Sequence, residues 1–214
     1  MSRAVLFDMD DTLLLTREVK WAHHRHVALE SYGITLDDAT LAEHWGKSFD
    51  EMIGLLYQHA DTVEAMRAAN KASAERFRKL PVPGAVELVE GLLDQDVAVG
   101  VVTSTNTDMA LADLEGCGFP MPRLALVHGA DVTGHHKPDP RVFDAALDQL
   151  AREGVDHVTY VGDALMDAQA SDEAGLDFVA VTTGLFDAEA FVSLGLAPER
   201  VVAGVDELRP LLGL

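Results

Sequence analysis

The chain has 214 residues, a length that fits one domain or a core with a small insert. Acidic residues outnumber basic ones by 36 to 16, and a net charge of −20 argues against nucleic acid or an anionic membrane as a partner. The single cysteine, Cys117, excludes an intrachain disulfide. No apolar run approaches the roughly 18 residues of a membrane span, and the first residues lack a secretory signal pattern, so we expect a cytoplasmic protein.

The first predicted element is a short buried strand over residues 4–7, which a pair of carboxylates follows directly. Asp8 and Asp10 stand two residues apart, so they repel each other, and one should hold its proton unless a cation is bound. A carboxylate beside a divalent cation can attack phosphorus and form an aspartyl-phosphate. Taken alone, the stretch also fits an ordinary turn, because Asp suits turns.

Residues 16–80 are predicted to form a small all-helical insert. Their apolar residues recur at helical spacing, and the composition from residue 60 to 80 favours helix strongly. Two prolines and a glycine between Leu80 and Gly84 end this pattern. We expect hinges at the two ends of the insert.

Beyond the insert, predicted strands alternate with predicted helices. The strands are expected at 97–103, 124–127, 158–161, 178–181 and 201–202, and the helices at 85–93, 108–115, 140–153, 165–174 and 205–212. Such alternation indicates a parallel sheet that is covered on both faces. The predicted fold class is therefore α/β, with a Rossmann-like parallel sheet core made by residues 1–15 and 81–214 and a helical cap inserted after the first strand.

The informative polar residues fall just after predicted strands. Thr103 and Ser104 follow the second strand, and Asp163 follows the strand at 158–161. Open α/β sheets bind ligands outside the carboxyl ends of their strands, so we expect these groups to meet the paired carboxylates at one edge. Lys137, just before a predicted helix, adds a positively charged side chain to this group of polar residues.

These residue types suit a phosphate monoester. The substrate brings close to two negative charges and the four aspartates Asp8, Asp10, Asp163 and Asp167 add more, so Mg²⁺ is the natural counterion. Lys137 can neutralise further charge as a compact point charge, and the hydroxyl of Thr103 or Ser104 can donate to phosphoryl oxygens. Phosphoryl transfer requires mostly such positioning and charge stabilisation.

Asp163 and Asp167 stand four residues apart, so they would share one face of a helix that begins at Asp163. Acidic residues at the start of a helix also stabilise its dipole with no further role. Beside the other groups, we interpret the two aspartates as part of the metal site.

Four motifs, in chain order, resemble those of the haloacid dehalogenase-like superfamily. They are Asp8-Met9-Asp10-Asp11-Thr12-Leu13, Val101-Val102-Thr103-Ser104, Lys137-Pro138-Asp139-Pro140 and Val161-Gly162-Asp163-Ala164-Leu165-Met166-Asp167. Together they span nearly the whole core. The insert resembles the helical cap of the phosphoglycolate phosphatase and β-phosphoglucomutase branch.

The resemblance implies a role for each of four catalytic residues. Asp8 would be the nucleophile, and Asp10 would protonate the leaving oxygen and then act as general base on the hydrolytic water. Thr103 would hold the transferring phosphoryl group, and Lys137 would bridge that group and Asp8. Dehalogenases of this superfamily carry no acid at the place of Asp10, so the resemblance implies a phosphoryl-transfer member.

The resemblance also implies the binding residues. Mg²⁺ would be held by Asp8, Asp163 and the backbone carbonyl of Asp10, with Asp167 in the same acidic loop as a ligand or as the partner of one. The backbone amides of Met9 and Asp10 would contact the phosphate.

A loop between two predicted cap helices carries Trp45, Gly46 and Lys47. Related caps place a substrate loop there, so these three residues are candidate specificity residues. A simple interhelical loop is the alternative.

The resemblance thus implies a Mg²⁺-dependent phosphatase for a small phosphorylated metabolite, such as phosphoglycolate or a sugar phosphate, acting as a monomer or homodimer. A phosphosugar mutase of the β-phosphoglucomutase type is an alternative. A non-catalytic protein that binds a phosphorylated ligand or partner is another, but a pure binder has no use for Asp10.

Overall fold

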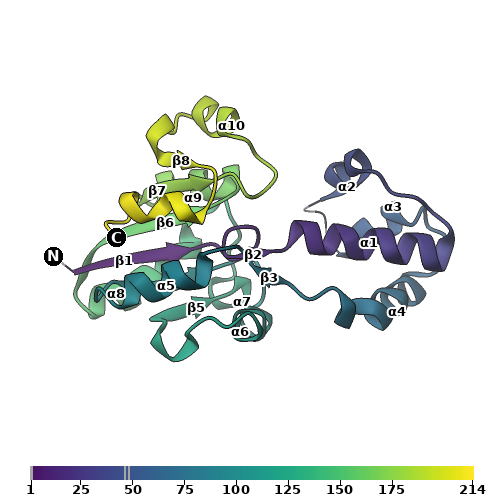
Figure 1. Ribbon diagram of the computed structural model, residues 1–214, viewed down its shortest axis with the longest axis horizontal. Coiled ribbons are helices and arrows are strands. Elements are labelled where there is room, and N and C mark those ends of the chain that lie inside the picture. The colour runs from purple at the N-terminus through teal and green to yellow at the C-terminus, as the bar shows by residue number, and fades with distance from the viewer. Residues whose placement is uncertain (1, 46, 48) are drawn as a thin grey trace. The chain divides into compact units, whose positions relative to one another are not determined.

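The computed structural model describes residues 2–45, 47 and 49–214, and the chain divides into two compact units (Figure 1). The larger unit consists of Met1–Leu15 and Pro81–Leu214, and the smaller one is Thr16–Leu80. Within the described residues, no helix combines the length and the apolar character that crossing a bilayer requires.

A six-stranded sheet runs through the described part of the larger unit in the order β5-β4-β1-β6-β7-β8. Its strands are β1 (Ser2–Phe7), β4 (Ala98–Val102), β5 (Leu126–His128), β6 (Val155–Gly162), β7 (Asp177–Val181) and β8 (Val201–Val202). Neighbouring strands pair in parallel, and β1 lies in the middle, where Phe7 is opposite Val101 on one side and Val161 on the other. The parallel sheet confirms the predicted α/β class and its Rossmann-like core.

Helices cover both faces of this sheet. They are α5 (Ala85–Leu93), α6 (Thr107–Gly116), α7 (Ala130–Thr133), α8 (Asp144–Arg152), α9 (Leu165–Glu173), α10 (Ala188–Ser193) and α11 (Leu208–Leu211). Alternate residues of β1 enter two separate apolar clusters: Phe7 packs in one with residues of α5, α6 and α11, and Leu6 in the other with residues of α8, α9 and α10. Burial on both sides explains why the first strand reads as a continuous apolar run.

The start of the helix predicted at 140–153 differs from expectation. Its first turn is the 3-10 segment Pro140–Phe143, and α8 begins only at Asp144. The Asp139 carboxylate accepts the N–H of Arg141 at 3.0 Å and so caps this turn. The helix predicted at 205–212 is likewise split, into the 3-10 segment Val205–Glu207 and α11.

A second sheet has two short strands, β2 (Leu14–Leu15) and β3 (Leu80–Pro81), at the junctions between the units. The sequence did not predict it, because two residues are too few to show a period. The N–H of Val82 donates to the carbonyl of Leu13 at 2.8 Å, so the chain leaves and re-enters the larger unit at adjacent points.

The smaller unit is helical. It contains α1 (Arg17–Tyr32), α2 (Asp38–His44), α3 (Phe49–Leu56), α4 (Val63–Ser73) and the 3-10 segment Ala74–Arg76. Side chains cap two of these helices: Asp37 accepts the N–H of Thr40, and Thr62 accepts the N–H of Ala65. An apolar cluster of its own, which includes Ile53, holds the unit together.

A buried polar network lies inside the smaller unit. The Tyr57 hydroxyl donates to Asn70 Oδ1 at 3.0 Å and lies 2.9 Å from His24 Nδ1. A hydroxyl has one hydrogen, so the Nδ1–H of His24 must be the donor to Tyr57. Burial, reinforced by His23 and Lys20, lowers the pKa of His24 to about 4, so this imidazole is neutral at pH 7.

Candidate active site

Loops at the carboxyl ends of the central strands bring three of the predicted acids together. Asp8 follows β1, Asp163 follows β6, and Asp167 lies in the first turn of α9. One carboxylate oxygen from each lies within 4.8 Å of the others, and all three residues are buried. The strand order explains this meeting, because β1 and β6 are neighbours and end at the same edge.

Lys137 joins this acid cluster. Its Nζ lies 2.6 Å from Asp8 Oδ1 and 2.7 Å from Asp167 Oδ1, and its side chain is only 3% exposed. Burial opposes the charge of the ammonium, but Asp167 and Asp8 outweigh this effect and raise the pKa of Lys137 well above its usual value. The lysine is therefore a fixed positive charge between two carboxylates.

The acids carry more negative charge than Lys137 offsets. Burial raises the pKa of Asp8 to about 7, aided by repulsion from Asp167 and Asp10 and opposed by Lys137. Burial, with repulsion from Asp8 and Asp167, raises the pKa of Asp163 to about 9. A divalent cation among these oxygens would favour the ionised form of each. Clustered carboxylate oxygens are the hard donors that Mg²⁺ takes, so the residues present fit that ion.

Asp10 is held separately from the three clustered acids. The hydroxyl of Thr105 donates to Asp10 Oδ2 at 2.7 Å. Sequence reasoning missed Thr105, although it follows the same predicted strand as Thr103 and carries a hydroxyl two residues further on. This contact orients the Asp10 carboxylate from the neighbouring strand's loop.

Thr103 and Ser104 lie in the loop after β4. The Thr103 residue is buried, and its hydroxyl accepts the N–H of Thr105 at 3.2 Å, while Ser104 is exposed. Both residues line a small hollow of about 10 Å³ to which Lys137 also contributes. The structure thus places Thr103, Ser104 and Lys137 around one hollow.

The Asp163 carboxylate is fixed from two sides that the sequence did not reveal. The hydroxyl of Thr12 donates to Asp163 Oδ1 at 3.1 Å. On the other side, a Cβ placed on Gly184 would lie 1.8 Å from Asp163 Oδ2, so only glycine allows this close approach. The neighbouring Thr183 hydroxyl donates to the carbonyl of Asp11, which ties the loop after β7 to the loop after β1.

A helical face shared by Asp163 and Asp167 depended on a helix that begins at Asp163, and this condition is not met. Helix α9 begins at Leu165, so Asp163 lies in the loop before it. Asp167 instead accepts the N–H of Ala164 at 3.0 Å, a hydrogen bond that closes the turn and leaves its other oxygen on Lys137. A tight turn, and not a helical period, brings the two acids together.

The remaining predicted binding residues lie in different settings. The Met9 side chain is fully buried in the core, so only its backbone is available to a ligand. In the smaller unit, Trp45 packs edge-on against Trp21 with ring centres 6.2 Å apart, and Lys47 pairs with Glu51 at 3.3 Å. Gly46 lies outside the described residues. The role of this segment in binding substrate stays a prediction.

Comparison with known proteins agrees with this geometry. Residues 5–181 match the family described as haloacid dehalogenase-like hydrolase. The chain is 28% identical over 208 residues to a phosphoglycolate phosphatase of Rhodospirillum rubrum, covering 91% of this chain and 85% of the relative. It is 24% identical to a phosphorylated carbohydrates phosphatase of Thermotoga maritima, covering 96% of this chain and 99% of the relative.

A solved structure of a candidate beta-phosphoglucomutase from Thermotoga maritima shares the fold. Its TM-score is 0.82 at 24% identity, with 99% of this chain and 98% of that chain covered. The family match extends from β1 through β7 and includes the Asp8 loop, Lys137 and the Asp163 loop. The chain therefore belongs to the haloacid dehalogenase-like hydrolases.

Proposed function

We propose that this phosphatase of the haloacid dehalogenase-like family is Mg²⁺-dependent and hydrolyses a small phosphate monoester, phosphoglycolate-like or sugar-phosphate-like, through an aspartyl-phosphate on Asp8. The observation that carries the proposal is the buried cluster of Asp8, Asp163 and Asp167, in which Lys137 pairs with Asp8 and Asp167. Asp10 accepts a hydrogen bond from Thr105 beside this cluster. The names of two relatives, a phosphoglycolate phosphatase and a phosphorylated carbohydrates phosphatase, support this substrate class.

The first step is transfer of the phosphoryl group to Asp8. The Lys137 ammonium holds Asp8 Oδ1, which orients the carboxylate for attack by an oxygen on phosphorus. As the new oxygen–phosphorus bond forms, the ester bond breaks, and protonated Asp10 gives its proton to the leaving alkoxide. Thr105, which holds Asp10 Oδ2, keeps the acid aligned with the leaving oxygen.

The second step is hydrolysis of the phosphorylated Asp8. Asp10, now a carboxylate, takes a proton from a water molecule as that water attacks phosphorus. The bond between Asp8 and phosphorus breaks, and inorganic phosphate leaves. Throughout both steps, Lys137 and the hydroxyls of Thr103 and Ser104 stabilise charge on the phosphoryl oxygens.

Asp8, Asp163, Asp167 and the backbone carbonyl of Asp10 would hold the Mg²⁺ ion. When bound, the ion supplies positive charge that offsets the charge of the phosphoryl group and of the acids. We assign substrate selection to the smaller, helical unit, including its Trp45–Lys47 segment.

The decisive test compares wild type with Asp8→Asn. We expect wild type to hydrolyse p-nitrophenyl phosphate with Mg²⁺ and to lose this activity in EDTA. Asp8→Asn should lower the rate by at least about a thousandfold, because no other group forms the covalent intermediate. Asp108→Asn, which removes an exposed acid from α6, controls for the charge change.

Two results would overturn the proposal. If wild type and Asp8→Asn hydrolyse a panel of phosphorylated metabolites equally poorly, the protein is not an enzyme of this kind but binds a phosphorylated ligand. Return of labelled phosphate to a sugar, in place of release as inorganic phosphate, would instead identify a mutase.

A further inference from the structure

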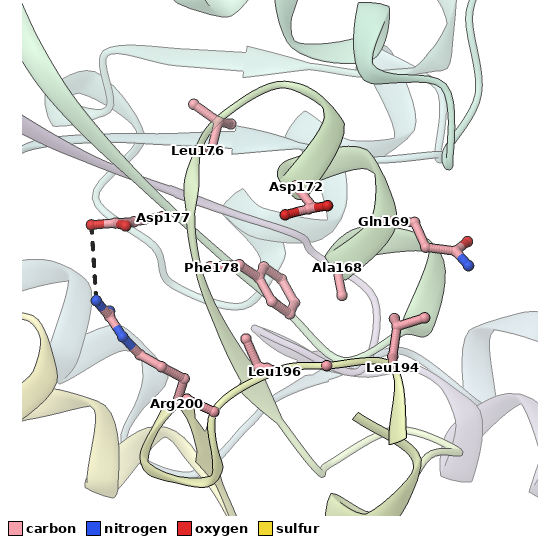
Figure 2. A pocket seen from close by; sticks show the side chains of 11 residues that line it. Ala168, Gln169, Asp172, Leu176, Asp177, Phe178, Leu194, Leu196 and Arg200 are labelled. Carbon is pink, nitrogen blue, oxygen red and sulfur yellow. Dashed lines mark ion pairs between the residues drawn. The ribbon is translucent and has the colours of Figure 1, made fainter. Parts of the chain in front are cut away.

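A second hollow lies on the larger unit, between α9 and the segment that follows α10 (Figure 2). Its volume is about 470 Å³, within the range of roughly 300–1,000 Å³ that small-molecule sites occupy. Ala168, Gln169 and Asp172 of α9 form one wall, and residues 194–197 form the other. This α9–α10 hollow shares no residue with the acid cluster, so the proposed reaction does not account for it.

The hollow has an apolar base. Phe178 of β7 lies at its centre, with Leu196 beside it, in Figure 2. The Phe178 ring packs against Tyr160, with ring centres 6.1 Å apart, and against Phe191, with ring centres 6.5 Å apart. Because neighbouring rings hold it, this surface is preformed and would receive an apolar group with little rearrangement.

The charges around the hollow favour a cation. Arg200 stands at the rim, but its guanidinium already lies 3.9 Å from Asp177, which also lies 3.2 Å from His157. Asp172, on the opposite wall, makes no ion pair with any residue that the structure describes. Two acids against one arginine leave a local excess of negative charge, in a molecule of net charge −20.

We propose that the α9–α10 hollow binds a small organic cation, an amine that carries an aromatic or branched aliphatic group. The apolar group lies on Phe178 and Leu196, and the ammonium lies toward Asp172. A phosphorylated or carboxylate ligand would meet the same two acids and is disfavoured.

Titration of 2-phenylethylamine, followed by amide chemical shifts, tests this proposal. We expect saturable shifts at the backbone amides of Ala168, Gln169 and Leu196. The neutral 2-phenylethanol should bind more weakly, and 3-phenylpropionate should cause no shifts there. The absence of saturable shifts, or equal binding of all three compounds, would overturn the proposal.

Three variants separate this site from a general charge effect. Asp172→Asn should weaken amine binding by up to about fivefold, which is the change in affinity that the loss of an exposed ion pair causes. Asp148→Asn, which removes an exposed acid from α8, should leave amine binding unchanged. Ala197→Trp fills the hollow from its exposed wall and should abolish the shifts while the melting temperature and the phosphatase rate persist. Equal weakening by both Asn variants, or unchanged binding by Ala197→Trp, would contradict the site. The chemical-shift readouts, which decide the proposal, do not depend on catalysis.

Discussion

Gly184 is a residue at which the backbone closely approaches the acid cluster. Replacing it with alanine would place a Cβ 1.8 Å from Asp163 Oδ2, so Asp163 must move. We expect Gly184→Ala to weaken Mg²⁺ binding by about 10- to 100-fold, the usual effect of disturbing a metal ligand's support. Titration calorimetry with Mg²⁺ measures this directly.

The matched control for that change is Gly116→Ala. Gly116 closes α6, and a Cβ there would meet nothing within 4 Å. Its Mg²⁺ affinity should equal that of wild type. Unchanged affinity in Gly184→Ala would show that Asp163 does not hold the ion.

Thr105 holds the carboxyl group of Asp10, which we propose transfers the proton. Thr105→Val removes the hydroxyl that donates to Asp10 Oδ2 and keeps the shape of the side chain. We expect kcat to fall by about 10- to 100-fold for an alkyl phosphate, because a misaligned acid loses part of the rate enhancement that general acid–base catalysis contributes. The loss should be smaller for p-nitrophenyl phosphate, whose leaving group needs little protonation.

Steady-state kinetics on both substrates check this prediction. Thr105→Ser should restore the alkyl phosphate rate, because it restores the donor. Thr107→Val, which removes a hydroxyl that bonds Asp131, should not alter the ratio of the two rates. An equal loss on both substrates would indicate a structural role for Thr105 and not an effect on the acid.

At the scale of the element, helix α1 depends on keeping a histidine neutral. Burial lowers the pKa of His24 to about 4, against an ordinary value of 6.5. The unfolded chain therefore binds the proton more readily, and stability is complete above pH 6.5 and falls as pH drops toward 4. The full loss is about 3 kcal/mol for such a shift.

Tryptophan fluorescence can follow this loss, because Trp21 and Trp45 are the chain's two tryptophans and both belong to the helical unit. His24→Gln cannot take up the proton, so its melting temperature should fall less between pH 6.5 and pH 4. Burial also lowers the pKa of His23, which adds to the fall in both proteins. If the melting temperatures of wild type and His24→Gln fall in parallel as the pH drops, the loss of stability is not due to His24.

Elements with long apolar runs could be predicted from the sequence, and so could the meeting of Asp8, Asp163 and Lys137 at one edge of the sheet, but the individual hydrogen bonds between elements could not. The runs at 4–7 and 97–103 stand out because helices bury both faces of their strands. The contact of Thr105 with Asp10 joins residues far apart in the chain and exists because β4 lies beside β1. Alternation of strands and helices leaves that strand order open.

The same limit applies to the last loops of the site. Gly184 approaches Asp163 because β7 lies beside β6. The local sequence of the loop does not indicate that these two strands are neighbours. The start of α9 at Leu165 agrees with the predicted helix at 165–174, but the turn before it could not be predicted, because the side chain of Asp167 fixes that turn only once its partners are in place.

At the scale of the whole molecule, each apolar cluster lies within one unit. Two clusters belong to the sheet unit and the third to the helical one. Because Val82 bonds Leu13, a short Gly-Ser linker can replace Thr16–Leu80. We expect the shortened protein to fold cooperatively, to bind Mg²⁺ and to hydrolyse p-nitrophenyl phosphate, but to lose its preference among phosphorylated metabolites.

Values of kcat/KM across a metabolite panel measure that preference. A flat profile in the shortened protein, beside a ranked profile in the intact chain, would locate selection in the helical unit. An unchanged ranking would place it in the sheet unit instead.

The central place of β1 has a consequence for how the protein is made. This strand pairs with β4 and β6, so a nascent chain leaving the ribosome carries an apolar segment that stays unmatched until residues 98–102 and then 155–162 have been added. The helical unit is one continuous stretch that ends at Leu80, so it is complete before either partner strand has been added. The synthesis of β1 is therefore separated in time from its incorporation into the sheet, and a chaperone that shields apolar segments has that interval in which to act.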